Sequence, residues 1–348
     1  MAKKALITGI RGQDGAYLSK LLLEKGYEVY GTDRRISDSQ EWRLSYLGIA
    51  KEIKILYMDL LEITNMMRTI ESVMPDEIYN LGSQSFVGTS FDQPALICEV
   101  NGMGVLRLLE TIRLIKADIK FYQASTSEMF GKAVEVPQTE KTPFYPGNPY
   151  GIAKVFGHLC AVNYRETYNM FICSGILYNH ESPLRGIEFV TRKITRGVAS
   201  IKYGLQDRLT LGDLEAKRDW GYAKEYVEGM WMMLRHKIPD TYILATGKTH
   251  SVKEFVEYAF KYAGYDIVWE GTGVNEKGMD KRTGKILIEV SPEFYRPSEP
   301  GLLTGNPDKA KEILGWEAKF KFEDLINLMI EEDMKFLSSA RKIIRECK

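Results

Sequence analysis

A glycine-rich loop stands near the start of the chain, next to a short apolar run. Residues 5–8 predict a β-strand, and residues 14–25 carry apolar side chains at helical spacing. Gly9, Gly12 and Gly15 join the two segments with GxxGxxG spacing. Glycine allows a tight turn and lets a pyrophosphate approach the amides at a helix N-terminus. A plain glycine-rich turn is the alternative, but the place between a strand and a helix predicts a dinucleotide-binding loop.

The same alternation continues through the first 130 residues. Further strands are predicted at 28–31, 53–58, 77–81 and 120–124, and further helices at 63–74 and 102–115. Alternating β and α units with short connections predict an α/β fold with a doubly wound parallel sheet. Right-handed crossovers bring the carboxyl ends of the strands to one edge, where ligands bind. We therefore expect a dinucleotide-binding domain over residues 1–175.

The pattern changes after about residue 175, where segments become longer and less regular. Helices are predicted at 188–201, 223–237 and 251–262, and Ser251 with Glu254 forms a capping-box pattern at the start of the last one. Residues 271–285 are rich in glycine and charge and predict a surface loop. We expect residues 176–340 to form mainly a smaller, mixed α/β lobe that binds substrate, with some segments returning to the first domain.

Composition excludes several classes of partner. Lys+Arg and Asp+Glu each number 47 in 348 residues, so a basic surface for nucleic acid is not expected. No run approaches the roughly 18 apolar residues of a membrane span, and the N-terminus lacks the pattern of a signal peptide. The four cysteines are scattered without metal-ligand spacing. We expect a cytoplasmic protein with no membrane, nucleic-acid or metal partner.

The end of the second predicted strand bears on the choice of cofactor. Asp33 stands where an acid would bind the ribose hydroxyls of NAD, whereas Arg34 and Arg35 stand where cations would bind the 2′-phosphate of NADP. The two adjacent cations favour NADP, NAD remains possible because of Asp33, and a solvated turn is the plain alternative. The loops after the first, third and fourth strands complete the predicted cofactor set, which is Gly9, Gly12, Gln13, Asp14, Gly15, Asp59, Leu60, Leu81, Gly82 and Gln84.

Four residues form the predicted catalytic set. Tyr150 and Lys154 are four apart in a helical segment, so they share one face, and Lys154 can lower the pKa of the Tyr150 phenol from its ordinary value of about 10. Lys154 can also bind the nicotinamide ribose. Thr126 and Glu128 follow the fifth strand, where Thr126 can bind a reacting hydroxyl and Glu128 can act as a base. The alternative is that Thr126 caps a turn and Glu128 is solvated.

Together these motifs resemble the extended short-chain dehydrogenase/reductase family, whose first domain has the Rossmann fold. The Thr126–Glu128 pair resembles that of nucleotide-sugar 4,6-dehydratases. Longer strings are similar to GDP-mannose 4,6-dehydratases in particular, at residues 12–18, 121–128, 142–146, 179–183, 190–196, 217–221 and 296–299. The resemblance extends over residues 4–333, nearly the whole chain.

The resemblance implies an NADP-dependent hydro-lyase of nucleotide-sugar metabolism, acting on GDP-D-mannose as a homodimer or homotetramer. Tyr150 and Thr126 would serve oxidation at C4, and Glu128 would remove the C5 proton before water leaves from C6 and the hydride returns there. It places His180 and Arg185 on the cofactor side. It assigns the GDP-sugar site to Ser85, Asn179, Glu181, Lys193, Arg218, Arg296 and Glu299.

Some positions depart from the family pattern and leave alternatives open. Residues 36–48 differ from the usual run, and Phe86 and Asn148 stand where His and Ser are common. The sugar could therefore be GDP-D-glycero-D-manno-heptose, with the same mechanism. A GDP-4-keto-6-deoxy-sugar reductase would need Tyr150 and Lys154 but no base. A non-catalytic NADP-binding regulator would keep the glycine loop but could lose Tyr150, Lys154 or Glu128, and all three are present.

Overall fold

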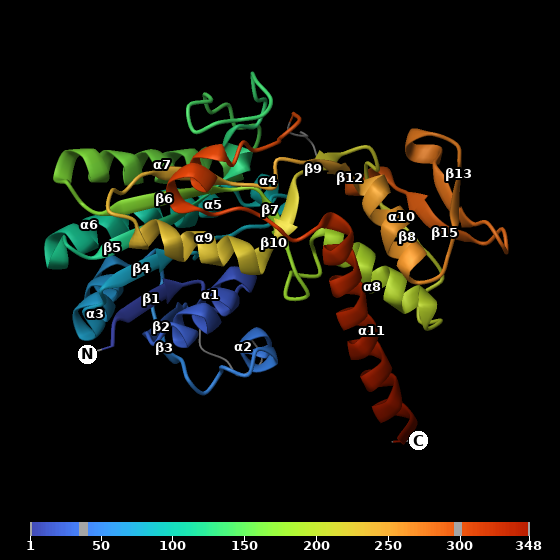
Figure 1. Cartoon of the computed structure of the whole chain (residues 1–348), viewed down its shortest axis with the longest axis horizontal. Helices are drawn as coiled ribbons and strands as arrows, with labels where there is room; N and C mark the ends of the chain where they lie inside the picture. Colours follow the sequence, from blue (N-terminus) through green and yellow to red (C-terminus); the bar gives the residue numbers. More distant parts are fainter. Residues whose placement is uncertain (1, 35–40, 296–300, 347–348) are drawn as a thin grey trace. The chain divides into compact units, whose positions relative to one another are not determined.

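The computed structural model describes residues 2–34, 41–295 and 301–346 (Figure 1). The chain divides into two compact units. The first unit contains Met1–His180, Ala223–Gly247 and Ser298–Lys319, and the second contains Glu181–Tyr222, Lys248–Pro297 and Phe320–Lys348. The chain thus crosses between the units several times. The assignment of cofactor to residues 1–175 and of substrate mainly to 176–340 stays a prediction.

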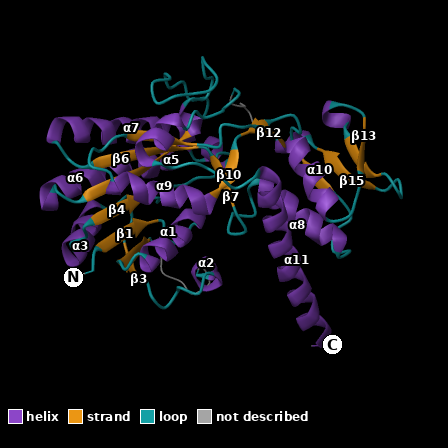
Figure 2. Cartoon of the chain, viewed as in Figure 1, coloured by secondary structure: helices purple, strands orange, loops and turns teal. Residues whose placement is uncertain are grey.

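A seven-stranded sheet, with every neighbouring pair parallel, forms the centre of the first unit (Figure 2). Its order is β11-β6-β5-β4-β1-β2-β3. This confirms the predicted doubly wound parallel sheet, although two of its strands, β6 and β11, were not predicted. Because the order reverses at β1, the switch point lies between β1 and β4. The strands are β1 (Lys4–Thr8), β2 (Glu28–Asp33), β3 (Lys54–Tyr57), β4 (Glu77–Asn80), β5 (Lys120–Thr126), β6 (Ile172–Leu177) and β11 (Thr241–Leu244).

Helices cover both faces of this sheet (Figure 1). On one face α1 (Gln13–Glu24) packs against α9 (Ala223–Arg235). On the other, α6 (Gly104–Lys116) lies between α3 (Ile63–Val73) and α7 (Pro149–Tyr168). Burial on both faces explains why the strands are apolar runs rather than alternating ones. The shorter helices are α2 (Trp42–Tyr46), α4 (Thr89–Asp92) and α5 (Pro94–Cys98), and π-helical turns occupy Glu99–Met103 and Ala310–Leu314.

The second unit has its own sheet and core. Its four-stranded sheet has the order β13-β14-β15-β8, and only the β15–β8 pair is parallel. Apolar side chains of α8, α10 and α11 pack with this sheet around Phe255, Phe260 and Ile326. The elements are α8 (Val190–Lys202), β8 (Leu209–Leu211), β9 (Lys217–Arg218), β10 (Trp220–Tyr222), β12 (His250–Ser251), α10 (Val252–Tyr262), β13 (Ile267–Glu270), β14 (Lys277–Asp280), β15 (Ile286–Val290) and α11 (Phe322–Glu346). The short strand β7 (Asn179–Glu181) spans the boundary between the units.

Two local predictions for the second unit have opposite outcomes. The capping box is confirmed, because the Ser251 side chain accepts from the Glu254 amide and the Glu254 side chain accepts from the Ser251 amide. The surface loop predicted at 271–285 is wrong, because Lys277–Asp280 forms the strand β14 inside the sheet. Pairing with β13 on one side and β15 on the other supplies the hydrogen bonds that hold this polar segment extended.

Gly9 is the glycine on which the turn after β1 depends. Its φ is +68°, and a Cβ there would lie 2.9 Å from the Gly82 Cα. Gly48 has a similar φ of +75° with open space around it. We expect Gly48→Ala to cost roughly 1–2 kcal/mol, the penalty for a side chain in this conformation. Gly9→Ala should cost clearly more, because the Gly82 backbone must also move. Urea unfolding of the ligand-free protein measures both, and equal costs would contradict the close approach.

Candidate active site

The carboxyl ends of β1, β2, β3 and β4 border a cavity of about 190 Å³ in the first unit. Six residues predicted to bind the cofactor line it, namely Gly9, Arg34, Asp59, Leu60, Gly82 and Gln84, together with Asp33. Gly12 begins α1 as its N-cap, and a Cβ on Gly15 would lie 2.5 Å from the Gly9 carbonyl oxygen. The glycine loop therefore packs directly against neighbouring backbone, where a side chain would not fit. Arg35 lies outside the described residues.

Arg11 is a charged residue of this site that sequence reasoning missed. Its guanidinium lies 3.1 Å from the Asp33 carboxylate and 3.1 Å from that of Glu41. The Arg11 side chain is 8% exposed, so these ion pairs are largely shielded from water. A cation inside the glycine loop, beside Gly12, was the available signal. The Asp33 carboxylate at the end of β2 is therefore paired with a cation.

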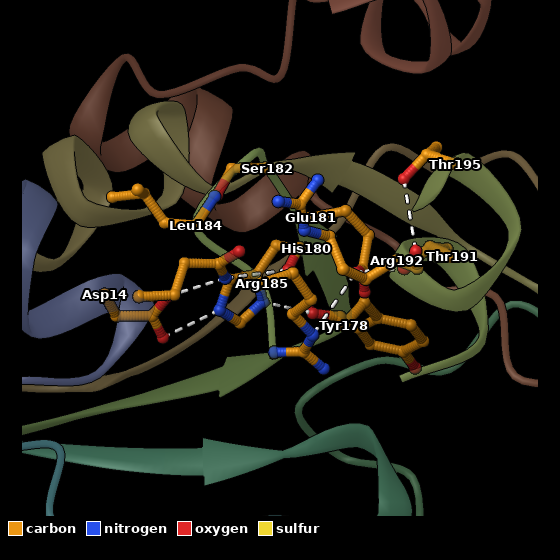
Figure 3. A network of polar contacts seen from close by, with 11 residues as sticks. Asp14, Tyr178, His180, Glu181, Ser182, Leu184, Arg185, Thr191, Arg192 and Thr195 are labelled. Atoms are coloured by element: carbon orange, nitrogen blue, oxygen red, sulfur yellow. Dashed lines mark hydrogen bonds and ion pairs between the residues drawn. The ribbon is translucent and has the colours of Figure 1, made fainter. Parts of the chain in front are cut away.

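A second cluster joins the start of α1 to His180 (Figure 3). His180 Nε2 lies 2.8 Å from Asp14 Oδ2, and Gln13 Nε2 donates to the His180 carbonyl at 3.0 Å. The other ring nitrogen of His180 lies 2.7 Å from the Tyr178 carbonyl, and its ring stacks on Tyr226. The structure thus brings together three residues that sequence reasoning placed on the cofactor side.

The loop after β4 is held by a residue that sequence reasoning did not single out. Asn101, buried in the π-helical turn before α6, accepts from the Gln84 amide at 2.9 Å and donates to the Gln84 carbonyl at 3.0 Å. Its side-chain oxygen also accepts from the Ser83 hydroxyl at 3.1 Å. The Gly82 amide donates to Thr8 Oγ1 at 2.8 Å. These contacts fix the part of the cavity wall that lies against Gly9.

Tyr150 and Lys154 lie on the first turns of α7. Lys154 Nζ is 5.7 Å from the centre of the Tyr150 ring and donates to the Ala124 carbonyl at 3.1 Å. Burial lowers the pKa of Lys154 to about 8, and the Asp14 carboxylate opposes that shift. Tyr150 is 7% exposed and packs with Val87, so both side chains are held in a mostly dry setting.

Thr126 and Glu128 stand where β5 ends, as predicted. Thr126 Oγ1 accepts from the Glu128 amide at 3.3 Å, so Thr126 caps the short turn Ser127–Met129. The Glu128 carboxylate is half-buried and accepts from Asn148 Nδ2 at 2.9 Å. Asn148 is the N-cap of α7. The fold therefore brings the carboxylate against the helix that carries Tyr150 and Lys154.

The second unit contains most of the residues assigned to the sugar nucleotide. Glu181 is buried, accepts from Thr191 Oγ1 at 2.5 Å and pairs with Arg185 at 3.2 Å (Figure 3). Lys193 Nζ lies 3.3 Å from the centre of the Phe294 ring, and burial lowers its pKa. Arg218 is half-buried on β9.

The remaining predicted residues are less buried or lie outside the described residues. In the first unit Ser85 is exposed, and Asn179 and Leu81 are half-buried. Arg296 and Glu299 lie outside the described residues. Within the described ranges, His, Cys, Asp and Glu side chains form no group of three that could hold a metal ion. Nor does any described helix have the length and apolar character needed to cross a membrane.

The sheet order, the glycine loop at the switch point and the Tyr150–Lys154 pair define the extended short-chain dehydrogenase/reductase fold. The solved dTDP-glucose 4,6-dehydratase from Bacillus anthracis, in complex with NAD, shares it with a TM-score of 0.78 and 20% identity, over 96% of this chain and 97% of that chain. The sequence pattern of a narrower family, described as GDP-mannose 4,6 dehydratase, matches residues 6–329.

Individual relatives agree with the family match. The GDP-mannose 4,6 dehydratase of Cricetulus griseus is 49% identical over 344 residues, which cover 96% of this chain and 92% of the relative. The GDP-mannose 4,6-dehydratase of Sinorhizobium fredii is 47% identical over 347 residues, which cover 98% and 99%. The chain belongs to the GDP-mannose 4,6-dehydratase family.

His158 lies two turns beyond Tyr150 on α7, and its titration tests how well this region is shielded from water. Its Nδ1 lies 2.8 Å from Ser125 Oγ, next to Thr126, and burial followed by the nearby Arg165 lowers its pKa to about 4. The unfolded chain, with the ordinary value of 6.5, binds the proton first as pH falls. Stability should therefore be full above pH 6.5 and decline towards pH 4, by up to about 3 kcal/mol from this group.

The variant His158→Gln isolates this contribution, because glutamine keeps a hydrogen-bonding group but does not titrate. Urea unfolding of both proteins at neutral pH and near pH 4 gives the comparison. We expect the native protein to lose more stability than the variant between the two conditions. Equal losses would mean that His158 is not shielded from water as the structure indicates.

Proposed function

We propose that this chain removes water from GDP-D-mannose and forms GDP-4-keto-6-deoxy-D-mannose. The observation that carries the proposal is the contact between Glu128 and the first turn of α7, the helix that bears Tyr150 and Lys154. A simple dehydrogenase or reductase needs the tyrosine and the lysine but has no use for a carboxylate base beside them. An elimination needs all three.

The first unit fits a nicotinamide dinucleotide. The cavity lies at the switch point of the sheet, its glycine wall leaves no room for side chains, and helix α1 begins beside it. When bound, such a cofactor supplies an acceptor for the hydride of C4 and a donor for C6. Gly9, Gly12, Gln13, Asp14 and Gly15 would hold its pyrophosphate.

The catalytic residues then divide the proton transfers between them. Protonated Lys154 stabilises the phenolate form of Tyr150, which takes the proton of the C4 hydroxyl and becomes the neutral phenol. Thr126 binds the same hydroxyl and orients it. Once C4 is a carbonyl, the C5 proton is acidic, and the Glu128 carboxylate removes it while an acid protonates the C6 hydroxyl, which leaves as water. C5 regains a proton when the hydride returns to C6. The overall reaction loses one water and involves no net oxidation.

We assign the sugar nucleotide to Ser85, Asn179, Glu181, Lys193, Arg218, Arg296 and Glu299. Lys193 and Arg218 provide the cations that a diphosphate requires. Glu181 is buried and pairs with Arg185, which we assign to the cofactor side. The heptose analogue is the second candidate substrate, because the catalytic set serves either sugar.

NADP is the cofactor that the charges favour. Arg11 neutralises Asp33, so this carboxylate is not a bare anion facing the cavity, and Arg34 is exposed at its edge. Both features suit a 2′-phosphate better than a pair of ribose hydroxyls. NAD stays the alternative because Asp33 lines the same cavity.

The proposal includes self-association in the cytoplasm. Ile152, Phe156 and Leu159 form an apolar stripe along α7 and are 54%, 43% and 53% exposed. Their spacing places them on one helix face, which is suited to a second copy of the chain.

Isotope labelling tests the proposed reaction. Deuterium placed at C4 of GDP-mannose should be recovered at C6 of the product, and C5 should acquire a proton from solvent. The product should be lighter by one water. A mixture of labelled and unlabelled substrate should give no crossover, because the label stays within one active site. Crossover, or stoichiometric consumption of added reduced cofactor, would instead indicate a dehydrogenase or reductase.

The same assay with Glu128→Gln and with GDP-manno-heptose sharpens the result. The glutamine variant should still bind the sugar nucleotide but lose at least about a hundredfold in turnover, because an amide cannot take the C5 proton. Near-normal dehydration by this variant would remove Glu128 from the mechanism. Faster turnover of the heptose than of the hexose would change the substrate and leave the mechanism intact.

Cofactor choice is tested with Arg34→Ala, alone and together with Arg35→Ala. Loss of a charge-assisted bond to phosphate is worth roughly 1.5–3 kcal/mol. We therefore expect NADP affinity to fall by about tenfold or more while NAD affinity changes little. Lys51→Ala, an exposed cation just before β3 at the opposite end of the strands, is the matched control. Equal losses for both cofactors would mean that these arginines do not bind the 2′-phosphate.

A further inference from the structure

Lys193 is a cation that has no anionic partner in the described part of the chain. It lies half-buried at the start of α8, and burial lowers its pKa, a shift that the charge of Glu293 opposes. Within the described ranges, no carboxylate forms an ion pair with Lys193, and no group accepts a hydrogen bond from its ammonium. Charges that are partly removed from water are usually paired, so this ammonium indicates a place for an anionic ligand.

The group that Lys193 does contact is an aromatic ring. Its Nζ lies 3.3 Å from the centre of the Phe294 ring, which is a close cation–π contact. Such a contact holds an ammonium through the negative face of the ring and leaves its net charge in place, whereas a carboxylate would cancel that charge. The N–H donors of the ammonium also stay available for another partner. Phe294 therefore holds the head group of Lys193 without neutralising it.

The backbone that carries the Phe294 ring is attached to strand β8. Phe294 ends a short turn whose N-cap is Ser291, and the Ser291 amide donates to the Leu211 carbonyl of β8 at 2.8 Å. The Phe294 amide donates to the Ser291 carbonyl at 3.2 Å, and a Cβ on Gly212 would lie 2.5 Å from the Phe294 carbonyl oxygen. Helix α8 packs against the same strand. The ring and the helix that bears the lysine therefore share one frame.

We propose that Phe294 is a positioning residue that presents the Lys193 ammonium to the diphosphate of the sugar nucleotide. The inference rests on the proposed function of Lys193 as a cation for that diphosphate. Without the ring, the flexible side chain of Lys193 would occupy many rotamers in the free protein, and the ligand would have to order it. Because the ring orders the side chain beforehand, this entropic cost does not fall on binding.

Calorimetric titration of the protein with GDP tests this role. Phe294→Leu keeps an apolar side chain but removes the ring, so GDP affinity should fall by about twofold to tenfold, the scale for ordering one flexible side chain. Phe294→Tyr keeps an aromatic face and should bind GDP as the native protein does. Phe294 is 48% exposed, so the tyrosine hydroxyl can reach solvent and the leucine leaves no enclosed cavity.

A second cation of α8 provides the matched control. The Arg196 guanidinium lies 4.3 Å from the centre of the Phe336 ring, and this ring is also exposed. Phe336→Leu should leave GDP affinity unchanged, although it is the same substitution beneath a cation of the same helix. A double-mutant cycle with Lys193→Met then shows how Phe294 acts. If Phe294 acts through Lys193, Phe294→Leu should cost no further affinity once residue 193 has lost its charge.

Several results would overturn the inference. Native affinity in Phe294→Leu, or an equal loss in Phe294→Tyr, would mean that the ring does not position the ammonium. An undiminished loss in the Lys193→Met background would assign Phe294 to direct contact with the ligand, and an equal loss in Phe336→Leu would indicate a general disturbance of the unit. Lys193→Met separates this inference from the proposed function. If it binds GDP normally, the assignment of Lys193 to the diphosphate is wrong, and if only Phe294→Leu binds normally, the positioning role alone fails.

Discussion

A buried chain of hydrogen bonds links the carboxyl ends of β1, β4 and β5, and the candidate site depends on it. Thr8 Oγ1 donates to Asn80 Oδ1 at 2.7 Å, Asn80 Nδ2 donates to Gln123 Oε1 at 2.9 Å, and Gln123 Nε2 donates to the Ala124 carbonyl at 3.0 Å. A buried polar group without a partner costs roughly 1–3 kcal/mol, so the three strands are held in one register at this edge. The candidate cofactor cavity and the segment with Thr126 and Glu128 both begin where these strands end.

The Ala124 carbonyl joins this chain to the catalytic helix, because it also accepts from Lys154 Nζ at 3.1 Å. At the other end of the chain, Thr8 Oγ1 accepts from the Gly82 amide and so holds the loop that lies against Gly9. One polar network thus connects the glycine cradle to the residues of α7. A displacement at either end would leave buried donors or acceptors unpaired, so the network favours a site that is already assembled before ligands bind.

In the second unit, the adjacent residues Arg192 and Lys193 of α8 have different roles. Arg192 contacts the fully buried Asp333 of α11, which also accepts from Thr195 at 2.8 Å. Burial raises the pKa of Asp333, and Arg192 opposes that shift. Lys193, the next residue, points to a different face of α8 and lies over Phe294. The string at 190–196 that resembles the family therefore contains both a structural cation and a candidate ligand.

Sequence patterns within one or two turns of chain were enough for much of the fold. Five of the seven parallel strands, the capping box of α10 and the helical pair of Tyr150 and Lys154 follow from local spacing. The two missed strands and β14 are defined instead by the partners that pair with them. The roles of the site residues stay predictions, although the fold gathers most cofactor residues around one cavity.

The sequence alone did not predict which partner each buried polar group would contact. Arg11 with Asp33, Asn148 with Glu128 and Asp14 with His180 are separated along the chain by between 20 and 166 residues. Periodicity and motif spacing describe neighbours on one helix or strand, because those positions are set by backbone geometry. Contacts between distant segments depend on how whole elements pack, and burial then requires each polar atom to find a partner there. The glycine loop and the helix with the YxxxK motif could therefore be recognised from the sequence. The partners of Asp14, Asp33 and Glu128 were decided by tertiary packing.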